Sequence, residues 1–366
     1  MHKKVNASIV PKREPPNRVL SFFINIEFNA LMQKTIFRTI EQALGERGEM
    51  SMRKYAKYVL RRLLAMIPIL LIVSFAIFFL LRMSGSSELA TIIGEKQATE
   101  ELKAQVTEEY GLDQPMLLRY FDWLKGVAVG DFGKDYTSGQ DVGELIASRI
   151  PVTLGLVGIS FAAGTILAII LGVIAALYKN KPVDTGISLV MLFFSSVPSF
   201  LVCVIVLILM VKFVPGYSFV GTYNNTAEFF QRISVPAAIM ALGQLALLGR
   251  VTRSSMTSQL QAPYITTAKA KGISRNSIIF KHAFHNAVIP VLTVAGSTLA
   301  SSIGGTVLIE QIFSLPGIGG LLISGVQTSN YPVVQILVMI MLLIYLMVSL
   351  IVDLLYVIVD PRVQLK

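Results

Sequence analysis

Residues 61–83 read RRLLAMIPILLIVSFAIFFLLRM, an apolar run with arginine near both ends. A helix needs about 20 mostly apolar residues to cross the hydrocarbon core of a bilayer, and this run is long enough. The rest of the chain is similar, because 54% of its 366 residues are hydrophobic and only 15% are charged. This composition is typical of a membrane protein with several spans and excludes an ordinary soluble domain.

Further runs of this kind predict an all-α integral membrane protein. By the same criterion about six spans lie near residues 62–82, 152–178, 187–213, 234–258, 286–313 and 333–358. The fourth run is the weakest, because Gln244 and Arg250 interrupt it. A five-span alternative would place the two chain ends on opposite sides of the membrane.

The distribution of Lys and Arg predicts the orientation, because cytoplasmic loops are enriched in these residues. With six spans, most of the basic loops fall on one side together with both termini, which are therefore predicted in the cytoplasm. Residues 83–150, where acids outnumber bases, are predicted to form an extracytoplasmic helical segment. Within this segment Leu117, Tyr120, Phe121 and Leu124 recur at helical spacing and predict an apolar face on the membrane or the spans. The net charge of +10 is explained by the basic loops and anionic lipid, without a nucleic-acid partner.

Residues 1–51 differ from the membrane domain that is predicted over 52–366. Their start, MHKKVNASIVPKREPPNRVL, is polar, basic and proline-bearing, which predicts disorder. The residues GERGE before Met50 and Met52 can be encoded by purine-rich codons that spell a ribosome-binding sequence. We therefore expect a misassigned start, with Met50 or Met52 as the first residue. The alternative is a genuine cytoplasmic tail.

The sequence has no pattern typical of a metal site, a cofactor site or an enzyme active site. No Cys or acid completes a metal site with His282 and His285, and the lone cysteine, Cys203, cannot form a disulfide within the chain. There is no G-x-x-x-x-G-K-[ST] phosphate loop and no nucleophile–base pair. We therefore expect a non-catalytic protein without a cofactor.

Two residues at membrane depth are candidates for a pathway or gate. Pro198 is expected to kink or break span three, because proline lacks the N–H of a helical backbone bond. Glu310 lies near the end of span five, and a charge at that depth usually faces a bundle interior or a water-filled cavity. A structural contact is an equally favoured role for Glu310, and it is the expected role of Asp353.

The loop between spans four and five, APYITTAKAKGISRNSIIFKHAFHNAVIP over 262–290, has the pattern of a docking element. Pro263 suits the first turn of a helix and Gly272 the position just past its end, which predicts a helix of about nine residues. Small side chains at 267, 268 and 270 would let another protein approach closely. Ser274 can cap a second helix that continues into span five.

This loop resembles the cytoplasmic coupling loop in membrane subunits of ABC importers. In particular, it resembles the first permease subunit of the oligopeptide, dipeptide and nickel uptake family. The segments YGLDQP, GDFG, RIPVTL, SSVPSF, VLIEQIFSLPGIGGLL, SNYPVVQ and VDLLYVIVDPRV also resemble that family, in its order, from about Met52 onward. The wider importer pattern begins Glu-Ala-Ala where this chain has Thr266, Thr267 and Ala268. This departure favours the peptide branch, whose Thr-Ala-Arg/Lys-Ala-Lys-Gly fits residues 267–272.

The resemblance implies half of a translocation pathway in a bacterial cytoplasmic membrane. The implied partners are a second homologous permease subunit, two cytoplasmic ATP-binding subunits and an extracytoplasmic binding protein that delivers an oligopeptide or dipeptide. The implied ATPase-coupling residues are Tyr264, Thr266, Thr267, Ala268, Ala270, Lys271 and Gly272. Nickel or another small solute is the alternative substrate. A secondary transporter is a further alternative, but discontinuous helices in matching halves with ionisable residues at mid-membrane are not evident.

Overall fold

The computed structural model of the chain describes residues 50–83, 88–94, 99–214, 216, 223 and 225–359. Tyr55–Lys366 form one compact unit. Among the described residues every regular element is a helix, and an isolated β-bridge joins Lys134 and Asp141. The predicted all-α membrane fold is confirmed. The prediction for residues 1–51 falls almost wholly outside the described residues.

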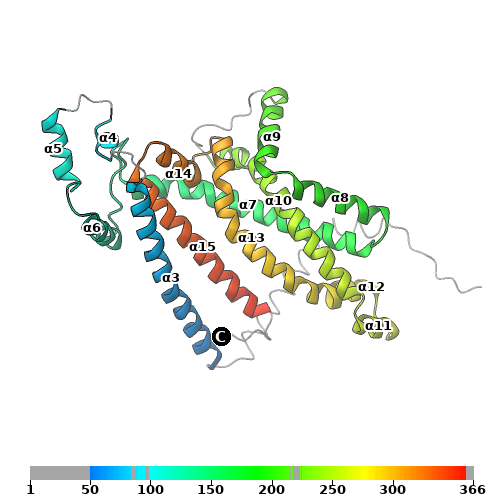
Figure 1. Cartoon of the computed structure of the whole chain (residues 1–366). Coiled ribbons are helices and arrows are strands. Elements are labelled where there is room, and N and C mark those ends of the chain that lie inside the picture. The colour runs from blue at the N-terminus through cyan, green and yellow to red at the C-terminus, as the bar shows by residue number, and fades with distance from the viewer. Residues whose placement is uncertain are drawn as a thin grey trace, which may run out of the picture. The chain divides into compact units, whose positions relative to one another are not determined.

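Five helices are long and apolar enough to cross a membrane (Figure 1). They are α3 (Met50–Met83), α7 (Val142–Leu177), α10 (Thr226–Leu260), α13 (His285–Ile312) and α15 (Tyr331–Val359). α10, the weakest of the predicted spans, is continuous. Its Gln244 side chain is buried, and the amide nitrogen donates to Ser302 Oγ at 3.2 Å, so this donor finds its partner inside the bundle.

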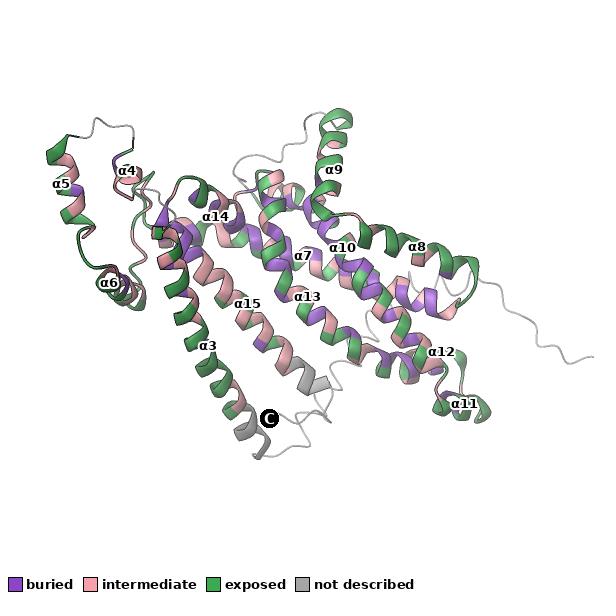
Figure 2. Cartoon of the chain, in the orientation of Figure 1, coloured by how far each residue is buried: buried purple, intermediate pink, exposed green. Residues whose placement is uncertain are grey.

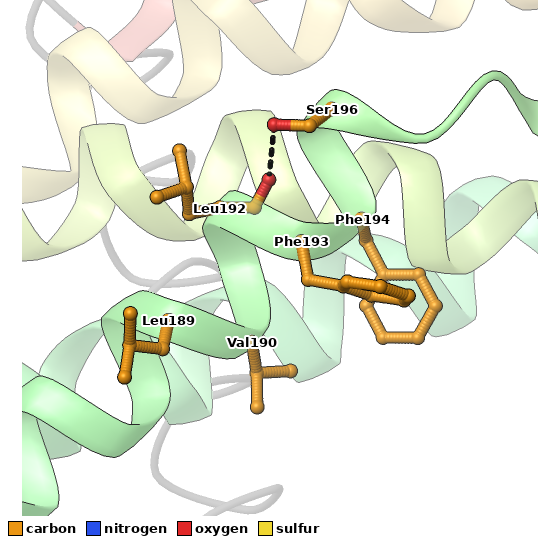
Figure 3. Close-up of a pocket in the computed structure, with 6 residues that line it drawn as sticks. All are labelled: Leu189, Val190, Leu192, Phe193, Phe194 and Ser196. Carbon is orange, nitrogen blue, oxygen red and sulfur yellow. Dashed lines mark hydrogen bonds between the residues drawn. The ribbon is translucent and has the colours of Figure 1, made fainter.

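The third predicted span consists of two helices. α8 (Pro182–Ser196) and α9 (Ser199–Phe213) meet at an angle of 96°. Val197 between them is extended, with φ −89° and ψ 124°, because a proline disfavours the helical region for the residue before it. The predicted break at Pro198 is therefore confirmed. Beside the break, α8 carries an apolar hollow lined by Leu189, Val190, Leu192, Phe193, Phe194 and Ser196 (Figure 3).

α7 and α10 form the most extensive helix pair of the bundle. A Cβ atom added at Gly164 would lie 3.0 Å from the carbonyl oxygen of Ala241, and one at Gly172 would lie 2.8 Å from that of Gly249. Small residues allow this close approach of helices in lipid. Because the contacts advance in the same direction along both helices, α7 and α10 are parallel. α8 and α9 therefore carry the chain back from the end of α7 to the level where α10 begins, which supports a six-span count.

The other spans alternate in direction. Ser255 near the end of α10 donates to the Ala287 carbonyl near the start of α13, at 2.9 Å. α3 and α15 are joined near one end by an ion pair of 2.7 Å between Arg62 and Asp353, which is the structural contact expected for Asp353. The start of α3 and the end of α15 thus lie at the same end of the bundle as the loop after α10.

The predicted helical segment between the first two spans is confirmed. It contains α4 (Glu88–Ile93), α5 (Glu100–Glu109) and α6 (Met116–Val129). Tyr120 of α6 packs against α3, with its hydroxyl 2.9 Å from Ser74 Oγ, whereas Leu117 and Phe121 are each 54% exposed. The predicted apolar face therefore divides between the spans and the surface.

A half-buried polar cluster holds this segment against the end of α3. Glu88 accepts from Arg82 at 3.2 Å, from Arg119 at 2.6 Å and from the Tyr136 hydroxyl at 2.7 Å. Burial raises the pKa of the Tyr136 phenol, and the neighbouring Glu88 carboxylate raises it further. The cluster joins α3, α4, α6 and the connection to α7.

Candidate functional site

The predicted helix in the loop after α10 is present as α11 (Pro263–Ala270), with proline at its start. It ends where Gly272 adopts a left-handed conformation, with φ +75°. The N–H of Ile273 donates to Ala268 O at 3.2 Å, and the N–H of Gly272 donates to Lys269 O at 3.0 Å. These two bonds make a Schellman motif, in which glycine avoids the strain that a Cβ would impose. The glycine elbow is therefore confirmed.

The side chains of α11 divide into a buried and an exposed set. Ile265 is 1% exposed and Ala268 is 7% exposed, whereas the exposed set is Pro263, Tyr264, Thr266, Thr267, Lys269 and Ala270. Lys271 and Gly272 at the elbow are also exposed. One part of the prediction is wrong: Ala268 is covered by its own chain, so its small size does not offer an approach to another protein. The sequence pattern did not identify Ile265 as the residue that seats this helix.

The second half of the loop differs in detail from the predicted single helix. Ser274 takes the capping position of α12 (Arg275–Ser277), but its side chain makes no cap hydrogen bond. A π-helix, η1 (Ile278–Phe284), then joins α12 to α13. π-Helical turns are rare and frequently mark functional sites. No feature of the sequence had predicted this segment.

Side-chain hydrogen bonds connect α11 to the end of α10 and the start of α13. The Tyr264 hydroxyl donates to Gln259 Oε1 at 2.7 Å and accepts from Asn286 Nδ2 at 3.2 Å. Asn286 Nδ2 also donates to the His282 carbonyl at 3.1 Å. Asn286 was not among the predicted site residues, because only the fold brings it beside Tyr264.

The exposed surface of this loop is positively charged. Lys269, Lys271, Arg275 and Lys281 are all exposed. The sequence has no acidic residue between Glu228 and Glu310, and within the described part of the chain none of these four cations forms an ion pair. By contrast, Arg253 is paired with Asp184 at 2.5 Å. His282 and His285 belong to no group of three metal-ligating side chains among the described residues.

Glu310 is fully buried and organises a turn at the opposite end of α13. Its carboxylate accepts from Thr153 Oγ1 at 2.7 Å, and from the N–H groups of Gly319 at 2.8 Å and Gly320 at 3.0 Å. These two amides belong to the first turn of α14 (Ile318–Gln327), where a negative charge is favourable. Because its own chain encloses the carboxylate, the structure favours the structural contact for Glu310 over a lining of the pathway.

The break at Pro198 and a polar side of α13 are both exposed on the surface of the chain. Pro198 is exposed at the break between α8 and α9. One side of α13 also exposes polar residues at intervals of four or seven positions. This polar face of α13 consists of Asn286, Thr293, Ser297 and Ser301. The exposed surface of α3 is apolar by comparison, with Leu64 at 56%, Ile72 at 68% and Leu80 at 64% (Figure 2).

Comparisons with known proteins match most of the chain. Residues 168–365 match the family described as "Binding-protein-dependent transport system inner membrane component", and residues 55–157 match the N-terminal region of such components. The oligopeptide transport system permease protein AppB of Bacillus subtilis is 34% identical over 84% of this chain and 99% of its own length. OppB of Salmonella typhimurium, also an oligopeptide transport system permease protein, is 36% identical over 84% of this chain and 99% of its own. A Brucella abortus protein named for a peptide transport system is 36% identical over 84% of this chain and 98% of its own. With these matches along the bundle and the loop, the chain belongs to the family of inner membrane components of binding-protein-dependent transport systems.

Proposed function

We propose that this protein is a permease subunit of an ATP-driven peptide importer, in which it forms half of the translocation pathway. The partners in this proposal are a second, similar permease subunit, two cytoplasmic ATP-binding subunits and an extracytoplasmic binding protein. The names of the relatives, which refer to peptide or oligopeptide transport, support a peptide as the solute. The protein itself has the role of a membrane subunit, and ATP hydrolysis belongs to its partners.

The observation that carries the proposal is the ordered, exposed and basic loop over residues 262–284. We assign docking of an ATP-binding subunit to the ring of Tyr264 and to Thr266, Thr267, Ala270, Lys271 and Gly272, with Ala268 seating the helix from beneath. The buried Ile265 anchors α11, and the elbow at Gly272 ends it with two backbone hydrogen bonds. A partner that binds α11 therefore moves it as a rigid element. Rigid-body movement of this kind would pass from the closing ATP-binding dimer to the spans.

The four unpaired cations of the loop indicate the chemistry of the docking partner. We infer that the receiving surface of the ATP-binding subunit is acidic, because complementary charge steers association and excludes wrong partners. The same charges agree with a cytoplasmic position of this loop and of both chain ends. Residues 83–150 then face the binding protein outside the cell membrane.

The polar face of α13 is the surface that we assign to the pathway. Its hydroxyl and amide groups suit a water-filled passage, whereas the apolar surface of α3 suits lipid. The break at Pro198 is a second candidate for the pathway or gate. Glu310 would act on a gate only indirectly, through the position of α14.

Copurification and reconstitution test this proposal. The tagged protein, isolated from its own cells, should bring down two ATP-binding subunits and a second permease, identified by mass spectrometry. In liposomes the complex should take up peptide when ATP is inside and the binding protein is outside. Uptake of nickel but not of peptide would overturn the substrate, and uptake driven by an ion gradient without ATP would overturn the importer.

Charge reversal tests the docking surface. Lys269→Glu with Lys271→Glu should weaken binding of the ATP-binding subunits more than Lys269→Gln with Lys271→Gln does. Lys103→Glu is a matched control, because Lys103 is a basic residue of the outer segment. Equal binding by all three variants would exclude an acidic receiving surface.

A further inference from the structure

We propose that Tyr264 and Asn286 form a polar bridge that transmits movement of the coupling helix α11 to α13. This inference rests on the proposed function and deepens it by naming the positioning residues through which the loop acts on the pathway. The bridge is the hydrogen bond of 3.2 Å from Asn286 Nδ2 to the Tyr264 hydroxyl. It joins residues that are 22 positions apart in the sequence.

The covalent route between the two helices is poorly suited to transmission. From α11 it passes through the left-handed Gly272, then α12 of three residues, and then the π-helix η1. A π-helix has more residues per turn than an α-helix. If η1 converted to an α-helix, α13 would rotate relative to the loop, so η1 does not hold the two in a fixed orientation. The bridge adds a direct link from α11 to the first turn of α13, so the two helices do not depend on the covalent route alone.

The bridge is also anchored at both ends. On one side the Tyr264 hydroxyl donates to Gln259 Oε1 of α10 at 2.7 Å, which fixes the position of the hydroxyl. On the other side Asn286 Nδ2 donates to the His282 carbonyl at 3.1 Å, which fixes the amide against η1. The Tyr264 hydroxyl also lies 3.5 Å from the His282 carbonyl of η1, so a displacement of α11 pulls on α10, η1 and α13 together.

The position of Asn286 gives the bridge its consequence. Asn286 is the residue of the polar face of α13 that lies nearest the loop, and Thr293, Ser297 and Ser301 follow it along the helix. Ile265 and Ala268 hold α11 to the bundle by apolar packing, which resists separation but sets rotation weakly. A directional hydrogen bond to Asn286 instead couples rotation of α11 to rotation of the face that we assign to the solute.

The decisive variant is Tyr264→Phe, which removes one oxygen and keeps the ring. The assay is peptide uptake per ATP hydrolysed, measured with the full complex in liposomes. We expect this ratio to fall about three- to tenfold, the range for loss of one net hydrogen bond, while complex assembly and ATP hydrolysis are retained. Asn286→Leu should give the same loss, and the double variant should be no worse than either single variant. Ser254→Ala, which removes an exposed hydroxyl of α10 without a hydrogen-bond partner in the described part of the chain, should leave the ratio unchanged.

A normal uptake ratio in Tyr264→Phe would overturn the bridge, whatever Asn286→Leu does. So would a parallel fall of uptake, hydrolysis and assembly, because that pattern indicates a merely structural contact. The proposed function fails differently: the unaltered chain would then not assemble with ATP-binding subunits or would not take up peptide at all.

Discussion

Replacement of Glu310 by alanine should detach the first turn of α14. The carboxylate satisfies Thr153 Oγ1 and the N–H groups of Gly319 and Gly320, so the alanine variant leaves two buried donors and the half-buried Gly320 amide without it. An unsatisfied buried donor costs about 1–3 kcal/mol, which gives about 2–6 kcal/mol for the two buried donors. Since native proteins are stable by only about 5–15 kcal/mol, we expect reduced yield and a lower melting temperature in detergent.

Glu310→Gln separates the role of the charge from that of the shape. The amide keeps one acceptor oxygen, but hydrogen bonds to a neutral acceptor are about half as strong as those to a carboxylate. Relief of the cost of a buried charge offsets part of this loss, so we expect destabilisation of about 1–2 kcal/mol. Hydrogen exchange at the Gly319 and Gly320 amides should then be about five- to thirtyfold faster.

The control and the refuting result are both specific. Glu101→Ala removes an exposed carboxylate of α5 and should change neither the melting temperature nor exchange in α14. Unchanged exchange at Gly319 and Gly320 in Glu310→Ala would refute the assignment of this carboxylate to the helix cap. Unchanged stability together with lost uptake would restore Glu310 as a direct pathway or gate residue.

Three further predictions concern other parts of the chain. Gly272→Val should uncouple uptake from ATP hydrolysis, because a β-branched residue is strained at the φ of +75° even though open space surrounds this position. Gly272→Asn is the matched control, since asparagine tolerates this conformation, and equal uptake by both variants would exclude the elbow from coupling. Cysteine probes beside Lys103, Lys179 and Arg275 should be labelled from outside, inside and inside, respectively, since the native Cys203 is buried; outside labelling at Arg275 would contradict six spans. Deletion of residues 1–51 should leave insertion and uptake intact, because the basic residues from Arg53 to Arg62 remain; intact-mass measurement of the native protein decides whether the mature chain begins at Met1.

The features predictable from the sequence were those set by local chemistry. Length and apolarity located the spans, the missing N–H of Pro198 located the break, and the ability of Gly272 to adopt positive φ located the elbow. Each of these properties belongs to one residue or one continuous run. They are therefore visible without knowledge of the fold.

The features that escaped prediction depend on contacts distant in sequence. The burial of Ala268 depends on the packing of α11 against η1, and the environment of Glu310 depends on Thr153, which lies 157 positions away. The contact between Tyr264 and Asn286 likewise requires the reversal between α10 and α13. The periodicity of one helix gives its faces but does not say which neighbour covers each face.

The parallel pairing of α7 with α10 has a consequence for biosynthesis. Neighbouring spans that run in opposite directions can pair as soon as the second one leaves the ribosome, but α7 must wait until the chain has crossed back and α10 is complete. That interval covers roughly 80 residues, or about 4–16 s at the usual rate of elongation. During this time the surface of α7 that carries Gly164 and Gly172 lacks the helix that covers it in the folded chain. Glycine suits this delay, because it leaves no polar side chain in the bilayer while α7 awaits its partner.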